Sequence, residues 1–445
     1  MKKATLLMVA LLLAAVLSPV FAGGGGQQSG GAAAPAAAPA APVTITFTNW
    51  VSVEEGTQAG ILALEAAFQK DNPNIIVKNQ GIAVSDMIQQ LTIMGTAGNV
   101  PDVAQILSDN LVQLQSAGFL SPVDNILSPA FLSDLIPDLF DAVALINGKH
   151  YLSPWTITSN GFFYNKKLMA QAGLDPTKPP KTIDEMTAMM RTARQKLPDD
   201  VIMLQTDTTV RTIGLQHEWP LMLAFNDGVP PYTLDGKVSY NTPGMAAYME
   251  WMRMLVNEKL TLPGLRYGQF RPYAAQNKLL FGNDGSFFDG LIRALDESGA
   301  LTEDVFNQTW SATATPAGKD GKFRIPAQTH SLIIFDKSKN KPAAAKLIEY
   351  LVSSPNALNN YLAPNGFTPV TKSALSQSPA LASSQVVKDF LRDVVPASVF
   401  MPTGPDYASY AEIIMTGVQD AITSNRPVAD ILSEGQAKLE ALFKK

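Results

Sequence analysis

Tryptophan residues follow several of the expected strands, at places where a ligand could reach them. Trp50 ends an alternating apolar and polar stretch, while Trp155 and Trp219 lie at strand ends or loop–helix junctions. An indole face can stack on the apolar face of a sugar ring, provided that carboxylates or amides lie beside it to bind the hydroxyls. Core packing is the alternative for each of these rings.

Carboxylates follow two of the same strands. Asp109 comes just after the apolar stretch Pro101–Ile106, and Glu54 and Glu55 follow Trp50. An ionised carboxylate accepts hydrogen bonds and could bind ligand hydroxyls. Each has a structural alternative, since Asp109 could be a helix N-cap and the two glutamates could simply favour a helix start.

Residues for catalysis or metal binding form no recognisable pattern. The chain has no G-x-S-x-G sequence, and its three histidines are far apart and match no ligand spacing. Asp284 with Asp289, or Glu54 with Asp109, could form a glycosidase pair, yet no motif supports either pair. We therefore expect no enzyme activity, no bound metal and no cofactor. The adjacent His217-Glu218 is expected to be a surface or structural pair.

The N-terminal residues predict export. Lys2 and Lys3 precede an apolar stretch, Leu6–Leu17, that is too short to span a bilayer comfortably. Residues 1–22 are expected to be a signal peptide that is cleaved after Ala22. Residues 23–42 are rich in Gly, Ala and Pro and are expected to form a flexible tether.

The composition narrows the compartment and the partners. The chain has no cysteine, which excludes disulfides and the lipid-modified cysteine that anchors many exported bacterial proteins. We expect a periplasmic protein, with secretion into the medium as the alternative. A net charge of −5 gives no indication of nucleic-acid binding.

Strand and helix patterns alternate along the mature chain. Val43–Thr48, Ile75–Val77 and Pro101–Ile106 are expected strands, and helical stretches separate them. This order predicts an α/β fold with a largely parallel sheet. In such sheets ligands bind beyond the carboxyl ends of the strands.

Local signals refine this prediction. Asn147-Gly148 predicts a tight hairpin turn, and Thr182 with Glu185 predicts a capping box at a helix start. Trp251 lies in a methionine-rich stripe with helical spacing and is expected in the core. Trp310 stays ambiguous between the core and a ligand site.

Several stretches, in a fixed order over essentially the whole mature chain, match a known family. They are Ile45–Trp50, Phe68–Pro73, Val100–Val103, Gly118–Val123, Asn147–Pro154, Phe163–Leu168, Lys278–Gly285, Pro316–Gly321, Ser331–Ile334, Ala343–Leu351 and Gly366–Val370. With these stretches the chain resembles the extracellular solute-binding proteins of ABC importers, the group that contains maltose-binding and glycerol-3-phosphate-binding proteins.

The resemblance implies a type II periplasmic-binding-protein fold, with two α/β lobes and a hinge that the chain crosses more than once. The first lobe is expected to comprise residues 43–157 and 315–370, and the second residues 158–314 and 371–445. The resemblance also implies a monomer that closes over its ligand by hinge motion and is then recognised by an ABC permease. Many relatives have Gly-Gly where this chain has Gln328-Thr329-His330.

The resemblance also suggests ligand-binding residues. Position and family together favour the cleft for Trp50 and Trp155, and the family often places a ligand-binding acid where Asp109 lies. Thr156, Ser159 and Asn160 match positions where relatives donate hydrogen bonds, and Phe287 or Phe288 matches the position of a stacking ring. Gly366 is expected to permit a close backbone approach near the hinge. Tyr407 and Tyr410 lie where relatives contribute an aromatic residue late in the chain.

These features predict the substrate-binding component of an ABC importer for a sugar or short oligosaccharide. One alternative is a glycerol-phosphate-type or other small polar solute, whose phosphate Arg211, Arg266, Arg271 or Arg324 could bind. An exported glycosidase is the other alternative.

Overall fold

The structure is a computed structural model that describes residues 42–54, 57–404 and 406–444. The expected signal peptide with its cleavage position, residues 23–41 of the expected tether, and Glu55 all lie outside the described residues. Residues 42–445 form one compact unit. Among the described residues, no helix combines the length and the apolarity needed to cross a bilayer.

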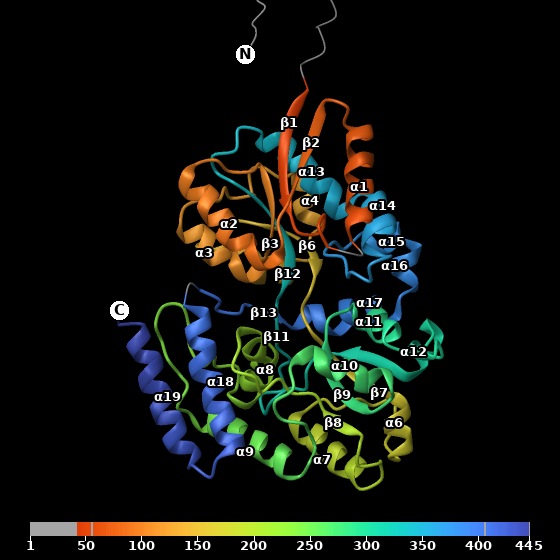
Figure 1. The fold of residues 1–445 in the computed structure, drawn as a ribbon, viewed down its shortest axis with the longest axis vertical. Helices are drawn as coiled ribbons and strands as arrows, with labels where there is room; N and C mark the ends of the chain where they lie inside the picture. Colours follow the sequence, from red (N-terminus) through yellow and green to blue (C-terminus); the bar gives the residue numbers. More distant parts are fainter. Residues whose placement is uncertain (1–41, 55–56, 405, 445) are drawn as a thin grey trace, which may run out of the picture. The chain divides into compact units, whose positions relative to one another are not determined.

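The first lobe is built on a five-stranded sheet of order β2-β1-β3-β12-β6, in the upper part of Figure 1. β1 (Val43–Asn49), β2 (Ile75–Gly81) and β3 (Val103–Leu107) are parallel, as the sequence predicts. β12 (Thr329–Ile334) runs antiparallel to β3 and to β6 (Ser153–Ile157). The carboxyl ends of β1, β3 and β6 therefore point the same way, toward the second lobe in Figure 1.

Helices cover both faces of this sheet in Figure 1. α1 (Gln58–Asp71) and α13 (Lys341–Ser353) lie on one side, and α2 (Val84–Ala97) and α3 (Leu111–Ser116) on the other. Apolar residues of these helices and of the strands form one buried cluster, which contains Phe47. Burying such side chains stabilises the fold by about 25 cal/mol for each Å² of apolar surface.

The second lobe contains a four-stranded sheet of order β10-β7-β9-β8. β7 (Gly161–Asn165) is antiparallel to both β10 (Trp310–Thr313) and β9 (Leu279–Asp284), whereas β8 (Ile202–Leu204) is parallel to β9. The expected alternation into a largely parallel sheet is thus wrong for this lobe. The reason is that β9 lies between β7 and β8, although both of these precede it in the sequence, so neighbouring strands in the sheet are not joined by successive crossover helices.

Two local predictions can be checked in the helices of the second lobe. Thr182 caps α7 (Ile183–Arg194), since its hydroxyl accepts a hydrogen bond from the backbone N–H of Glu185 at 3.2 Å. The carboxylate of Glu185 accepts from the N–H of Lys181 at 2.8 Å, one residue before the position of a capping box. In α9 (Pro243–Asn257), Trp251 lies in the core with the methionine stripe, as predicted.

The chain passes between the two lobes more than once, as the fold class implies. It does so after β6, again between β10 and β12, and a third time after residue 370. Ala374 and Leu381, which the predicted boundary assigns to the second lobe, pack in the first core, while Phe390 packs in the second lobe. The exact lobe boundaries stay a prediction.

The remaining elements complete the two lobes. Asn147 and Gly148 both have positive φ, 51° and 76°, in the predicted turn between β4 and β5. The elements are η1 (Ser108–Asn110), α4 (Pro129–Asp134), α5 (Pro137–Ala144), β4 (Leu145–Ile146), β5 (Lys149–His150), α6 (Lys166–Gln171), α8 (Thr212–Phe225), η2 (Tyr267–Phe270), α10 (Arg271–Ala275), α11 (Phe288–Ala294), α12 (Glu303–Thr309), β11 (Ile325–Pro326), α14 (Pro355–Ala357), η3 (Leu358–Leu362), α15 (Ala374–Gln377), α16 (Pro379–Ser383), α17 (Gln385–Asp389), η4 (Phe390–Val394), η5 (Val395–Ala397), β13 (Ser398–Val399), α18 (Tyr407–Thr423) and α19 (Val428–Leu442).

Candidate functional site

Side chains from both lobes meet at Asp109, which lies in η1 directly after β3. Its Oδ2 accepts hydrogen bonds from Nε2 of Gln216 at 2.5 Å and from Nε2 of Gln328 at 3.2 Å. Gln216 belongs to α8 of the second lobe, and Gln328 to the connection before β12. The helix that follows, α3, begins at Leu111, and its N-cap residue is Asn110, so Asp109 is not the N-cap that the alternative required.

Burial changes the acidity of Asp109. It raises the pKa of this carboxyl to about 7, although the two amide hydrogen bonds lower it in part. Near neutral pH the group can therefore exist in both protonation states. It can accept a hydrogen bond from a ligand hydroxyl, or donate one when it is protonated.

A second group of polar side chains lies on the second lobe. Nδ2 of Asn160 is hydrogen-bonded to Nδ1 of His217 at 3.0 Å, and the His217 ring stacks on Tyr267 with centroids 3.7 Å apart. Tyr267 also donates to the carboxylate of Asp284, the last residue of β9. Burial and the nearby charge of Arg271 lower the pKa of His217 to about 3, so its imidazole is neutral.

Arg271 extends this group toward an aromatic ring. Its Nε and Nη2 donate to the two oxygens of Asp284 at 2.9 and 3.1 Å. Its guanidinium carbon lies 4.9 Å from the centroid of the Tyr267 ring and 5.9 Å from that of Phe287. Arg271 is thus held by a carboxylate and by two rings.

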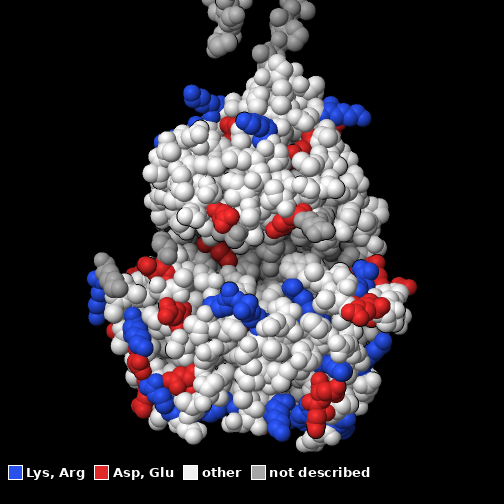
Figure 2. Space-filling model, in the orientation of Figure 1, with Lys and Arg blue, Asp and Glu red and all other residues white. Residues whose placement is uncertain are grey.

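A cavity of about 450 Å³ opens beside Phe287. The second lobe contributes Phe287 and Arg293 to its lining, and the first lobe contributes Asn359, Asn365 and Gly366. Cavities of this size accommodate small organic ligands. Figure 2 shows the surface between the two lobes as a hollow, with Asp and Glu above it and both Lys or Arg and Asp or Glu below it.

Gly366 lies at a contact between the lobes, where its positive φ rather than a lack of space favours glycine, and its part in ligand binding stays a prediction. It has φ of 67°, and its carbonyl accepts a hydrogen bond from the Ser286 hydroxyl at 3.0 Å. A Cβ at this position would lie 3.7 Å from Cα of Phe287. A backbone with positive φ favours glycine, so this contact between lobes depends on the residue type.

The predicted tryptophans lie inside the lobes. Trp50 and Trp155 are 2% and 1% exposed in the first core, and Trp219 is fully buried in the second. Nε1 of Trp155 donates to the carbonyl of Leu351 at 2.9 Å, and its ring stacks on Tyr361. All three rings thus take the core-packing alternative in this structure, and their part in ligand binding stays a prediction. Trp310, left ambiguous by the sequence, is also a core residue.

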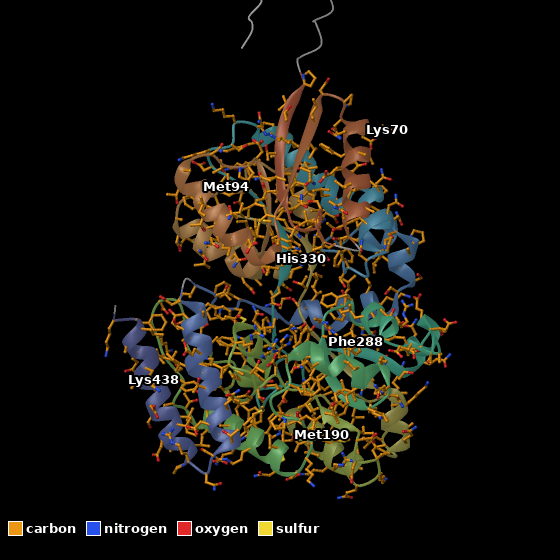
Figure 3. All side chains as sticks on the ribbon, in the orientation of Figure 1. Lys70, Met94, Met190, Phe288, His330 and Lys438 are labelled. Atoms are coloured by element: carbon orange, nitrogen blue, oxygen red, sulfur yellow. The ribbon has the colours of Figure 1, made fainter. Side chains whose placement is uncertain are left out.

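Trp50 lies close to the departure from the family pattern. His330, in β12, packs edge-on against Trp50 with ring centroids 5.2 Å apart. Figure 3 shows His330 at the end of the first sheet that faces the second lobe. Burial lowers the pKa of His330 to about 4, so this neutral ring can pack against the indole.

Other predicted residues divide between core and surface. Phe288, labelled in Figure 3, packs tightly against Phe163 of β7, so Phe287 rather than Phe288 can offer a ring to a ligand. Buried positions are occupied by Thr156, Ser159, Phe288 and Tyr410, and half-buried ones by Glu54, Asn160, Phe287 and Tyr407.

Sequence reasoning missed several residues of this site. His217 and Glu218, expected as a surface or structural pair, are buried rather than on the surface, since they are 5% and 1% exposed. A signal for their burial was present in the sequence, because these polar residues interrupt an otherwise apolar helix.

Among the described residues, no cluster of three or more His, Asp or Glu side chains is arranged to hold a metal ion.

The comparisons with known proteins agree with this architecture. The family described as bacterial extracellular solute-binding protein matches residues 50–358. The chain belongs to this family. Members of the family, and the neighbours below, are described as binding proteins rather than enzymes. The family description also places its members outside the cytoplasm.

Three similar proteins illustrate the range of this solute-binding family. A binding protein of Brucella abortus is 24% identical over 86% of this chain and 89% of its own. The maltotriose-binding protein of Pyrococcus abyssi is 23% identical over 81% of this chain and 72% of its own. The structure of the cyclic alpha-maltosyl-1,6-maltose binding protein of Arthrobacter globiformis has a TM-score of 0.74 and 20% identity, over 91% of this chain and 99% of that one. This last likeness establishes a shared fold.

Proposed function

We propose that this protein is the substrate-binding component of an ABC importer, which captures a sugar or short oligosaccharide between its lobes and delivers it to a membrane permease. The observation that carries this proposal is the meeting of polar side chains from both lobes at Asp109. A ligand that contacts both lobes stabilises the closed arrangement, and closure then signals occupancy to the permease.

Polar side chains around Asp109 and an aromatic ring at the 450 Å³ cavity, which line separate cavities, both suit a neutral, hydroxyl-rich ligand. Asp109, Asn160 and Gln328 supply oxygen and nitrogen atoms that can exchange hydrogen bonds with hydroxyl groups. Phe287 is half-buried at the 450 Å³ cavity and can pack against the apolar face of a sugar ring. The maltotriose-binding relative favours the same class of ligand.

The alternatives have weaker support. Of the carboxylates proposed for a glycosidase, Asp284 is paired with Arg271, and Asp289 with Arg293 at 2.6 Å. The Arg271 ion pair lowers the pKa of Asp284 in part, although burial raises it overall, and no motif supports either carboxylate as a catalyst. A phosphate-bearing solute would need a cation in the cleft, and Arg271 is already neutralised by Asp284. We therefore propose a binding protein that is not an enzyme, works as a monomer and is exported to the periplasm.

The test is a thermal-shift screen of the mature protein against maltotriose and other oligosaccharides, monosaccharides, sn-glycerol 3-phosphate and amino acids. A ligand that binds only the folded state raises the melting temperature, by an amount equivalent to about 2.7 kcal/mol when its concentration is 100 times Kd. A shift with one group of sugars is expected. A shift with glycerol phosphate and with no sugar would overturn the ligand assignment.

A further inference from the structure

A small cavity adjoins the contact at Asp109. Gln216 and Gln328, which both donate to Asp109, also line this cavity, together with His217, Asn283 and Thr315. Its volume is about 10 Å³. A cavity of this size has room for about one water molecule, provided that two to four polar groups face it.

Three of the lining side chains carry a buried polar atom that has no hydrogen-bond partner within the part of the chain that the structure describes. These atoms are Nε2 of His217, Oδ1 of Asn283 and Oγ1 of Thr315. They come from α8, from β9 and from the connection between β10 and β11. Buried polar atoms are rarely left unpaired, and three around one cavity indicate a shared partner.

The hydrogen-bonding roles of these atoms can be assigned. Nδ1 of His217 is hydrogen-bonded to the amide nitrogen of Asn160, which can only donate, so Nδ1 accepts. Because the imidazole is neutral, its proton is then on Nε2, which must donate. Oδ1 of Asn283 can only accept, and the Thr315 hydroxyl can do either.

Pro220 changes the hydrogen bonding of the helix beside the cavity. It lies inside α8 and lines the same cavity. Proline has no N–H, so the carbonyl of Gln216, four residues earlier, lacks its usual helical donor. This carbonyl belongs to a residue that borders the cavity.

We propose that this cavity is a binding site for one ordered water molecule that connects the second lobe to the hinge. The water accepts hydrogen bonds from His217 Nε2 and from the Thr315 hydroxyl, and it donates to Asn283 Oδ1 and to the Gln216 carbonyl. Its two protons and two lone pairs are then all used.

This water would act as a positioning group. It ties the turn of α8 that carries Gln216 to Thr315, which lies where the chain passes from the second lobe back to the first. The side chain of Gln216 is then held in place to reach Asp109 of the first lobe. The proposal does not depend on the identity of the transported solute.

A crystal structure of the mature protein at about 1.5 Å resolution tests the site directly. We expect one well-ordered solvent peak within hydrogen-bond distance, roughly 2.7–3.2 Å, of His217 Nε2, Asn283 Oδ1 and Thr315 Oγ1. Well-ordered side chains with no peak among them, or side chains paired with each other, would overturn the proposal.

Substitutions supply a second test with a matched control. Thr315→Val keeps the shape and removes one partner, and Asn283→Leu removes another. Magnetic relaxation dispersion counts long-lived internal waters, and the double variant should lose one relative to the wild type. Thr371 is also buried with an unpaired hydroxyl but does not line this cavity. A crystal structure of Thr371→Val should therefore keep the solvent peak beside His217 Nε2, Asn283 Oδ1 and Thr315 Oγ1. An unchanged count in a folded double variant would contradict the proposal.

Discussion

Asp109 of the first lobe and Gln216 of the second lobe are joined by a direct hydrogen bond of 2.5 Å between Oδ2 and Nε2. The two residues are separated by 107 positions in the sequence. Gln328, in the connection between the lobes, donates to the same oxygen at 3.2 Å. The Asp109 carboxylate therefore links both lobes and one hinge segment. Loss of its hydrogen bond to Gln216 or to Gln328 should change how the lobes close.

Gln216→Leu should shift the lobes toward an open arrangement. The variant removes the donor, keeps a similar volume and leaves Asp109 with only Gln328. Small-angle X-ray scattering should show an increased radius of gyration relative to the wild type. Gln195 is exposed at the end of α7, so Gln195→Leu is the matched control and should scatter like the wild type. Identical scattering by all three proteins would show that this bond does not hold the lobes.

Glu218→Gln should flatten the dependence of stability on pH. Burial raises the pKa of Glu218 to about 8, from 4.5 for the exposed group. The folded state then binds more protons than the unfolded state between these values, so stability falls as pH rises from about 4.5 to 8. Melting temperatures measured across this range give the slope.

Glutamine can replace the protonated glutamate at this position. Glu218 accepts from the N–H of Asp207 at 2.9 Å and is bonded to the Tyr248 hydroxyl at 2.8 Å. The amide oxygen and nitrogen can serve these two partners. Glu297 is exposed, so Glu297→Gln should keep the wild-type slope. A steep decline retained in Glu218→Gln would assign the effect to Asp109 or Glu65, whose pKa values burial also raises to about 7.

The sequence predicts where the strands end better than it predicts whether an aromatic ring is buried or faces the cleft. Asp109 could be predicted because an apolar run followed by a carboxylate marks the end of a buried strand. The burial of Trp155 could not, because its ring is covered by Tyr361 and its N–H is taken by Leu351, 196 residues away. Contacts at such separations leave no periodic signal in the sequence.

The same limit applies to the polar group on the second lobe. Gln216, His217 and Glu218 are consecutive in α8, so their side chains are spread around the helix and mark no single face that could be assigned to a cleft. Tyr267 of η2 and Asp284 at the end of β9 are brought together by a tertiary hydrogen bond. The sequence contained these residues but not the juxtaposition that makes them a site.

Phe287→Ala should weaken sugar binding and leave stability nearly unchanged. The ring is half-buried at the cavity and lies outside the three hydrophobic cores. A lost stacking contact is worth about 1 kcal/mol, or roughly fivefold in Kd. Isothermal titration with maltotriose measures the change. Phe323 is 42% exposed, so Phe323→Ala is the control, and equal affinities for the two variants would exclude stacking on Phe287.

Trp155→Ala should destabilise the whole protein. The side chain is 1% exposed between Phe47 and Tyr361, and its loss leaves a cavity and an unpaired Leu351 carbonyl. Replacing a core tryptophan with alanine costs about 3–5 kcal/mol. Urea unfolding followed by circular dichroism measures this loss.

The control for this prediction is an exposed aromatic residue. Phe400 is 48% exposed, so Phe400→Ala should unfold at the urea concentration of the wild type. A Trp155→Ala protein with wild-type stability and reduced affinity for maltotriose would contradict this prediction and would indicate that the Trp155 ring contacts the ligand. A loss of stability with unchanged affinity at low temperature would establish that Trp155 supports the first lobe, because the binding surface then survives without it.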